Sequence, residues 1–164
     1  MKKFGIYFFI ILFAIQCKKP TGDELSPFDG ITETDPIGRI VSIDPNDWGY
    51  DRYFTVEYDT LDGQTIPMES VIYPPFPNPA FEIITFKFGL NYSLNVNIEI
   101  LSQKGNRVKL ISLKEPLKEG IHYLHWDLSD NKGEKLKSGL YRIIFKYLDG
   151  IEEVFTCVGD VQIY

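Results

Sequence analysis

The sequence has few of the side chains on which most catalytic and metal sites depend. Its 164 residues include only two cysteines and two histidines. A Ser/His/Asp set has little support with so few imidazoles, and neither a paired-cysteine zinc motif nor a glycine-rich phosphate loop is present. An enzyme is therefore the least favoured class, and we expect no catalytic residue, no cofactor and no metal.

The two histidines, His122 and His125, are three residues apart. On a strand this spacing sends the rings to opposite faces, so they are not expected to share a metal. The acidic loop that follows, residues 127–133, suggests calcium, but its sixth position is Lys132 and its twelfth is Ser138, which fails the EF-hand pattern. Turn chemistry is the favoured account of this loop, and a calcium loop of another kind is the alternative.

Basic residues are also in deficit. Lysine and arginine number 17 against 23 aspartates and glutamates, and Lys2 and Lys3 belong to the amino-terminal leader described next. Nucleic-acid binding depends on Lys and Arg side chains that neutralise phosphates. The charge balance therefore argues against a nucleic-acid partner.

The leader contains the one long apolar run. Residues 4–15 follow a short positive segment and are too few to span a bilayer, which needs about 20 apolar residues. They fit the hydrophobic region of a signal peptide over residues 1–16. The run ends in Ala14-Ile15-Gln16-Cys17, which resembles the lipobox of bacterial lipoproteins. That resemblance implies that Cys17 is lipidated and anchors the protein to a membrane; an ordinary cleaved signal is the alternative.

If Cys17 carries lipid, Cys157 has no partner for an intrachain disulfide. It lies in the apolar, strand-like run of residues 154–158. Cysteine in such a setting commonly packs as a small hydrophobic residue, which is the favoured interpretation. A reactive thiol, or one that pairs between molecules, is the alternative.

The segment before the main domain divides into two parts. Residues 17–38 are rich in proline and acidic side chains and lack periodicity, so we expect a disordered tether. Residues 39–72 are expected to form an N-terminal β segment that packs on the main domain, with strands at 39–43 and 54–58 and a hairpin turn at Asp62-Gly63. Trp48 is expected to be a packed anchor of this segment; an exposed binding aromatic is the alternative.

Regular alternation begins after residue 80, and no segment beyond the leader has helical periodicity. Strands are predicted at residues 84–90, 96–100, 108–113, 121–127, 140–147, 152–158 and 161–163. Short strands separated by frequent turn signals are typical of sandwiches. The chain is therefore predicted to be all-β, with an immunoglobulin/fibronectin-III-like β-sandwich of about seven strands over residues 73–164 and extra strands before it.

Two motifs frame this sandwich. The first is Phe76-Pro77-Asn78-Pro79-Ala80, and the second runs from Trp126-Asp127 through Asp130-Asn131-Lys132-Gly133 to Ser138-Gly139-Leu140-Tyr141. Their order and spacing resemble the type A sorting domains of type IX secretion and the related Ig-like domain of the flagellar hook-capping protein. The motif residues that we single out are Pro77, Asn78, Pro79, Trp126, Asp127, Asp130, Gly133 and Gly139.

Physical roles for these residues can be stated independently of the resemblance. The prolines are expected to fix an extended entry into the first strand. Trp126 is expected to fill the inter-sheet core, and residues 127–133 to form a turn in which Gly133 adopts positive φ. Gly139 is expected to permit close approach at the start of a strand.

The leading functional hypothesis is an outer-membrane lipoprotein, on the periplasmic face or the cell surface. Its Ig-like domain would be a non-enzymatic structural or interaction module with an envelope protein as partner. One alternative is a type IX secretion substrate or accessory. Such sorting domains usually end in a lysine-rich strand, whereas residues 158–164 contain no lysine. The other alternative to the lipoprotein hypothesis is a carbohydrate-binding module that uses Trp48 and exposed tyrosines.

Overall fold

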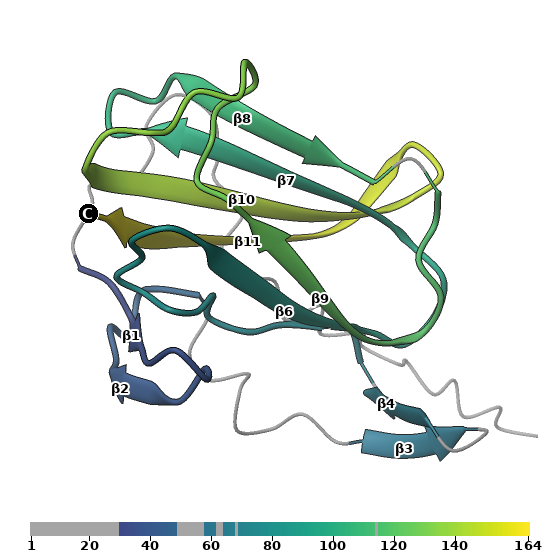
Figure 1. Ribbon diagram of the computed structural model, residues 1–164. Coiled ribbons are helices and arrows are strands. Elements are labelled where there is room, and N and C mark those ends of the chain that lie inside the picture. The colour runs from purple at the N-terminus through teal and green to yellow at the C-terminus, as the bar shows by residue number, and fades with distance from the viewer. Residues whose placement is uncertain (1–29, 49–57, 62–63, 68, 114) are drawn as a thin grey trace, which may run out of the picture.

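The computed structural model describes residues 30–48, 58–61, 64–67, 69–113 and 115–164 (Figure 1). These residues form strands and connecting turns, with no helix among them. Accordingly, the described part of the chain contains no helix long and apolar enough to cross a membrane. The leader, Cys17 and most of the predicted tether lie outside the described residues.

Two antiparallel sheets form the sandwich. The larger has the order β11-β10-β7-β8, and the smaller has the order β5-β6-β9. Their seven strands confirm the predicted fold class. The bounds in the larger sheet are β7 Asn95–Ser102, β8 Arg107–Ser112, β10 Gly139–Asp149 and β11 Glu152–Ile163. Those in the smaller sheet are β5 Val71–Ile72, β6 Ile84–Leu90 and β9 Gly120–Trp126.

The alternation of apolar side chains determines which face of each strand is buried. In β7, Val96, Ile98 and Ile100 are fully buried, whereas Asn97 and Glu99 between them are partly exposed. Successive side chains on a strand point to opposite faces, so one face of β7 packs in the core. The same period made these strands predictable from sequence.

Aromatic rings join the two sheets. Phe145 of β10 contacts Phe88 and Phe86 of β6, with ring centroids 5.1 Å and 6.1 Å apart. The hydroxyl of Tyr147 crosses to the smaller sheet and donates to the carbonyl of Val71 at 2.9 Å. Tyrosine thus fills the core with its ring while its polar end finds a partner.

Two small hairpins precede the sandwich. Their strands are β1 Glu33–Thr34, β2 Ile40–Ser42, β3 Tyr58–Leu61 and β4 Gln64–Pro67. β2 falls within the strand predicted at 39–43, and β3 pairs with β4 on either side of residues 62–63. Of the strand predicted at 54–58, only Tyr58 lies in the described residues. Figure 1 places β1 and β2 near the carboxyl end of β11, and β3 and β4 on the other side of the molecule.

The predicted tether extends too far. Residues 30–38 belong to the fold, because they contain β1 and the buried residues Thr32 and Thr34. The hydroxyl of Thr34 donates to the carbonyl of Pro75 at 2.8 Å. A two-residue strand held by polar side chains gives no periodic hydrophobic signal, which is why sequence analysis assigned it to the tether.

The predicted last strand is not separate. β11 runs without interruption from Glu152 to Ile163, although Gly159-Asp160 suggested a break. Gly159 lies within the strand because the indole of Trp48 occupies the space beside it: a Cβ there would lie 2.1 Å from the indole. Asp160 is accommodated by an ion pair with Arg142 of the neighbouring strand.

Candidate functional site: the two motifs and the N-terminal segment

Asn78 is the centre of the first motif and is 0% exposed. Its side-chain nitrogen donates to the carbonyls of Thr32 at 2.9 Å and Asp160 at 3.2 Å. Its side-chain oxygen accepts from the backbone N–H of Gln162 at 3.0 Å. One amide thus joins the N-terminal segment to the last strand, a role that the sequence did not reveal.

The prolines on either side, Pro77 and Pro79, lie along the end of β11, and both X-Pro peptide bonds are cis. The expected extended entry into β6 is wrong in detail, because residues 81–83 separate the motif from that strand. Ala80 instead forms a parallel bridge with Ile163. The motif therefore acts as an edge segment of the larger sheet.

Asp47 and Trp48 anchor the N-terminal segment from the other side. Trp48 is 1% exposed and belongs to the core, which confirms the packed interpretation. The carboxylate of Asp47 accepts from the N–H groups of Thr32 at 2.7 Å and Asp160 at 2.8 Å. Burial raises the pKa of Asp47 to about 7. No local sequence signal identified this contact, because Asp47 and Asp160 are 113 residues apart.

Asp160 also forms an ion pair with Arg142. The guanidinium donates to the two carboxylate oxygens of Asp160, each at 2.8 Å, and both side chains are buried. A buried pair with two parallel hydrogen bonds has a fixed geometry. It therefore holds the end of β11 in register with β10.

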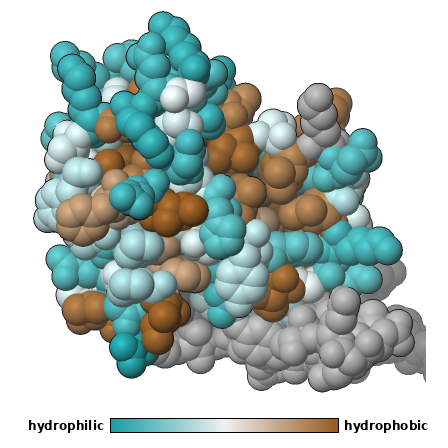
Figure 2. Space-filling view, in the orientation of Figure 1, coloured by the Kyte–Doolittle hydropathy of each residue, from teal (hydrophilic) through white to brown (hydrophobic). Residues whose placement is uncertain are grey.

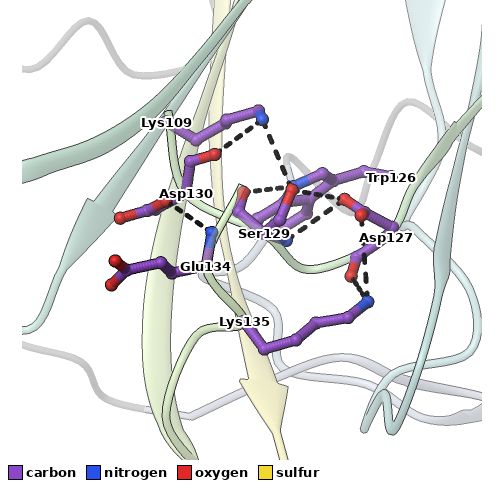
Figure 3. Close-up of polar contacts among 7 residues, drawn as sticks. All are labelled: Lys109, Trp126, Asp127, Ser129, Asp130, Glu134 and Lys135. Carbon is purple, nitrogen blue, oxygen red and sulfur yellow. Dashed lines mark hydrogen bonds and ion pairs between the residues drawn. The ribbon is translucent and has the colours of Figure 1, made fainter. Parts of the chain in front are cut away.

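The second motif is a loop after β9 with several hydrogen bonds among its own residues (Figure 3). Trp126 is 3% exposed, and its indole N–H donates to the carbonyl of Ser129 at 2.9 Å. Asp127 accepts from the hydroxyl of Ser129 at 2.6 Å, and this bond is the main cause that lowers the pKa of Asp127. The loop is thus folded back onto the indole that begins it.

Asp130 organises the other half of the loop. Its carboxylate accepts from the N–H groups of Lys132 at 2.8 Å and Glu134 at 3.0 Å, and the bond from Glu134 is the first cause that lowers its pKa. Gly133 has φ of 84°, as predicted. These contacts are turn chemistry.

Gly139 does not have the predicted role. A Cβ at this position would lie 3.9 Å from the ring of Tyr141, which is ordinary contact. Close approach is instead required at Gly159, next to Trp48. The signal for Gly159 was a glycine inside an apolar strand pattern, which often marks such an approach.

The histidines lie on opposite faces of β9, as predicted. His122 stacks on Phe88 with centroids 5.4 Å apart, whereas the Nδ1 atom of His125 lies 2.9 Å from the hydroxyl of Thr85. Cys157 is buried, which confirms the packed interpretation. Among residues 30–48, 58–61, 64–67, 69–113 and 115–164, no three acidic, histidine or cysteine side chains gather where they could hold a metal ion.

The loop of the second motif is therefore not expected to bind calcium. Its two aspartates already accept hydrogen bonds from their own loop. We predict that the thermal unfolding midpoint is the same in millimolar CaCl₂ and in EDTA. A calcium-dependent rise in the midpoint that disappears in Asp130→Ala would contradict this prediction.

The fold is similar to part of PorU from Porphyromonas gingivalis, solved as a latent dimer. The TM-score is 0.50 at 24% identity, over 57% of this chain and 9% of PorU. The likeness is one of fold. It confirms the β-sandwich predicted from the sequence, and the matched part is a small fraction of PorU.

Two weaker likenesses are to FlgD. FlgD from Pseudomonas aeruginosa matches with a TM-score of 0.42 and 20% identity, over 49% of this chain and 61% of FlgD. Truncated FlgD from Helicobacter pylori matches with a TM-score of 0.41 and 23% identity, over 65% and 70%. No family model and no curated protein sequence matches the chain.

Proposed function

We propose that the chain is an outer-membrane lipoprotein, anchored through Cys17, whose β-sandwich binds an envelope protein and catalyses no reaction. The observation that carries the interaction role is the apolar surface of the β1–β2 hairpin. Ile37 is 71% exposed and Val41 is 66% exposed, and Ile43 beside them is also exposed. Figure 2 shows hydrophobic residues at the lower left, where Figure 1 places this hairpin.

Contiguous exposed apolar residues mark contact surfaces in folded proteins. This hairpin is also rigidly joined to the sandwich through Thr34 and Asn78, whose backbones exchange hydrogen bonds at 2.8 Å and 3.2 Å. A partner that binds the hairpin would therefore be coupled to the whole domain. The proposed lipid anchor at Cys17 precedes the first strand of the hairpin, which begins at Glu33, by 16 residues.

The test is cross-linking of the full-length lipidated protein in intact membranes, followed by identification of the captured proteins. The double variant Ile37→Glu/Val41→Glu should reduce capture of the specific partner by at least tenfold, because burying each side chain contributes about 1.5–3 kcal/mol. Ile151→Glu is the matched control, since Ile151 is exposed on the β10–β11 turn, at the other end of the molecule from the hairpin. Equal capture by all three proteins would contradict the proposed surface.

The anchor itself is tested separately with Cys17→Ser. The variant is expected to lose its incorporation of labelled palmitate and to leave the membrane fraction. Protease treatment of intact cells then distinguishes the cell surface from the periplasmic face. An unchanged membrane fraction for Cys17→Ser would contradict lipid anchoring.

A type IX substrate or accessory is the second candidate, and the fold likeness to PorU favours it. Deleting residues 154–164 is not a useful test, because Val161 and Ile163 of β11 are core residues. The informative comparison is surface delivery of the intact chain in cells with and without a working type IX system. The carbohydrate-binding alternative loses its main residue, because buried Trp48 cannot stack on a sugar.

A further inference from the structure

The four-stranded sheet has two edge strands, β11 and β8. The outer side of an edge strand presents backbone N–H and C=O groups that can pair with a strand from another molecule. In this protein the outer sides of both strands receive hydrogen bonds from the two sequence motifs. An asparagine lies at the centre of the contacts at each edge.

At β11 the side chain of Asn78 makes hydrogen bonds that a neighbouring strand would otherwise make. Its side-chain oxygen accepts from the N–H of Gln162, and its side-chain nitrogen donates to the carbonyl of Asp160. Two further groups complete the edge: Asp47 accepts from the N–H of Asp160, and the N–H of Ala80 donates to the carbonyl of Gln162 at 2.8 Å. The outward groups of Asp160 and Gln162 are thereby satisfied.

At β8 the corresponding residue is Asn131 of the second motif. Its side-chain oxygen accepts from the N–H of Leu110 at 3.1 Å, and its own N–H donates to the carbonyl of Val108, also at 3.1 Å. Lys109, between these two, donates from its ammonium to the carbonyl of Asp130 at 2.8 Å. The loop of the second motif is thus held along the edge of β8.

We infer that Asn78 and Asn131 protect one stretch of each edge of the four-stranded sheet, at Asp160–Gln162 of β11 and Val108–Leu110 of β8, against strand addition by a second copy of this chain. The side-chain amide of Asn78 donates and accepts as a peptide bond does, and Asn131 supplies its side-chain oxygen and its backbone N–H. Each residue therefore satisfies the edge groups that it meets without offering a ladder that another strand could extend. Self-pairing is the expected competitor because β8 of one molecule could lie antiparallel to β8 of another, with partly exposed Leu110 at the contact. The inference is independent of the proposed partner and anchor.

Asn131 carries the test because it is exposed, so its replacement should leave the fold intact. Asn131→Ala removes the acceptor for the N–H of Leu110, whereas Asn131→Asp keeps an oxygen at the same place. Asn106→Ala is the matched control, since Asn106 is an exposed asparagine in the turn before β8. The protein used is the chain from residue 18 onward, which lacks the leader and lipid site and keeps every described residue.

Two measurements are required. Amide hydrogen exchange at Leu110 should be faster in Asn131→Ala by several-fold to about tenfold, and unchanged in the other two variants, because one hydrogen bond is lost. Sedimentation velocity over a concentration series should show self-association of Asn131→Ala at concentrations about tenfold lower than for the unsubstituted protein. Unchanged exchange at Leu110 in Asn131→Ala would overturn the hydrogen bond from Leu110 to Asn131. Faster exchange without added self-association would overturn the inference that Asn131 prevents strand addition.

Discussion

Replacing Gly159 with alanine is expected to destabilise the protein by about 1–3 kcal/mol or more, as overpacking of a tight core does. A Cβ at this position would lie 2.1–2.4 Å from three atoms of the Trp48 indole. Either the indole or β11 must move, and β11 is held at Asp160 and Gln162 by hydrogen bonds to Asp47 and Asn78. Urea unfolding monitored by circular dichroism would measure the change in the free energy of unfolding.

Trp48→Ala provides the control for that prediction. Alone, it should cost about 3–5 kcal/mol, because a large buried ring is removed. In the Trp48→Ala background the added methyl group of Gly159→Ala meets an empty space, so the second substitution should cost little. Near-additive costs in this double-mutant cycle would show that the indole is not the obstacle.

The stability of the protein is expected to fall as pH rises from about 4 to about 7. The pKa of Asp47 is about 7 in the folded protein against an ordinary value of 3.8, and burial is the main cause. Within this interval the folded state binds a proton that the unfolded state has released, so the proton favours folding. The total loss in the free energy of unfolding across this interval is on the order of 4 kcal/mol. Above pH 8 Asp47 is ionised in both states, so its titration should no longer change the free energy of unfolding.

Asp47→Asn is the matched variant, since it removes the titrating group and keeps the side-chain size. It loses one acceptor and should be less stable at low pH, but the slope of stability against pH between 5 and 7 should become nearly flat. Asp160, which raises the pKa of Asp47 through its negative charge, and Arg142, which pairs with Asp160, are the charged groups at this junction. An equally steep slope in Asp47→Asn would assign the dependence to another group.

The sandwich could be predicted because its strands carry a local signal. Val96, Ile98 and Ile100 repeat every second residue, and so do Ile84, Phe86 and Phe88. This period reports which face is buried without any knowledge of the partner strand. The packing of Trp48 was predicted on a different ground, that it is the main anchor of the N-terminal β segment.

The junction at β11 could not be predicted, because its partners are far apart in the sequence. Asp47 bonds to Asp160 across 113 residues, and Asn78 bonds to Gln162 across 84. Single polar side chains have no period, and their burial depends on which backbone groups meet them in three dimensions. The motif therefore identified Asn78 as important but not as an edge residue.

The meeting of the first described segment with the last strand has a consequence for synthesis. Asp47 and Trp48 need Gly159 and Asp160, which leave the ribosome more than 100 residues later. Until β11 has been made, the indole of Trp48 lacks the strand against which it packs. The chain between Asp47 and Asp160 must also close into a loop before their contact contributes any stability. The domain therefore completes its fold only after β11 has been synthesised, and a chain that stops before β11 leaves the indole of Trp48 exposed to the chaperones and proteases that recognise unfinished proteins.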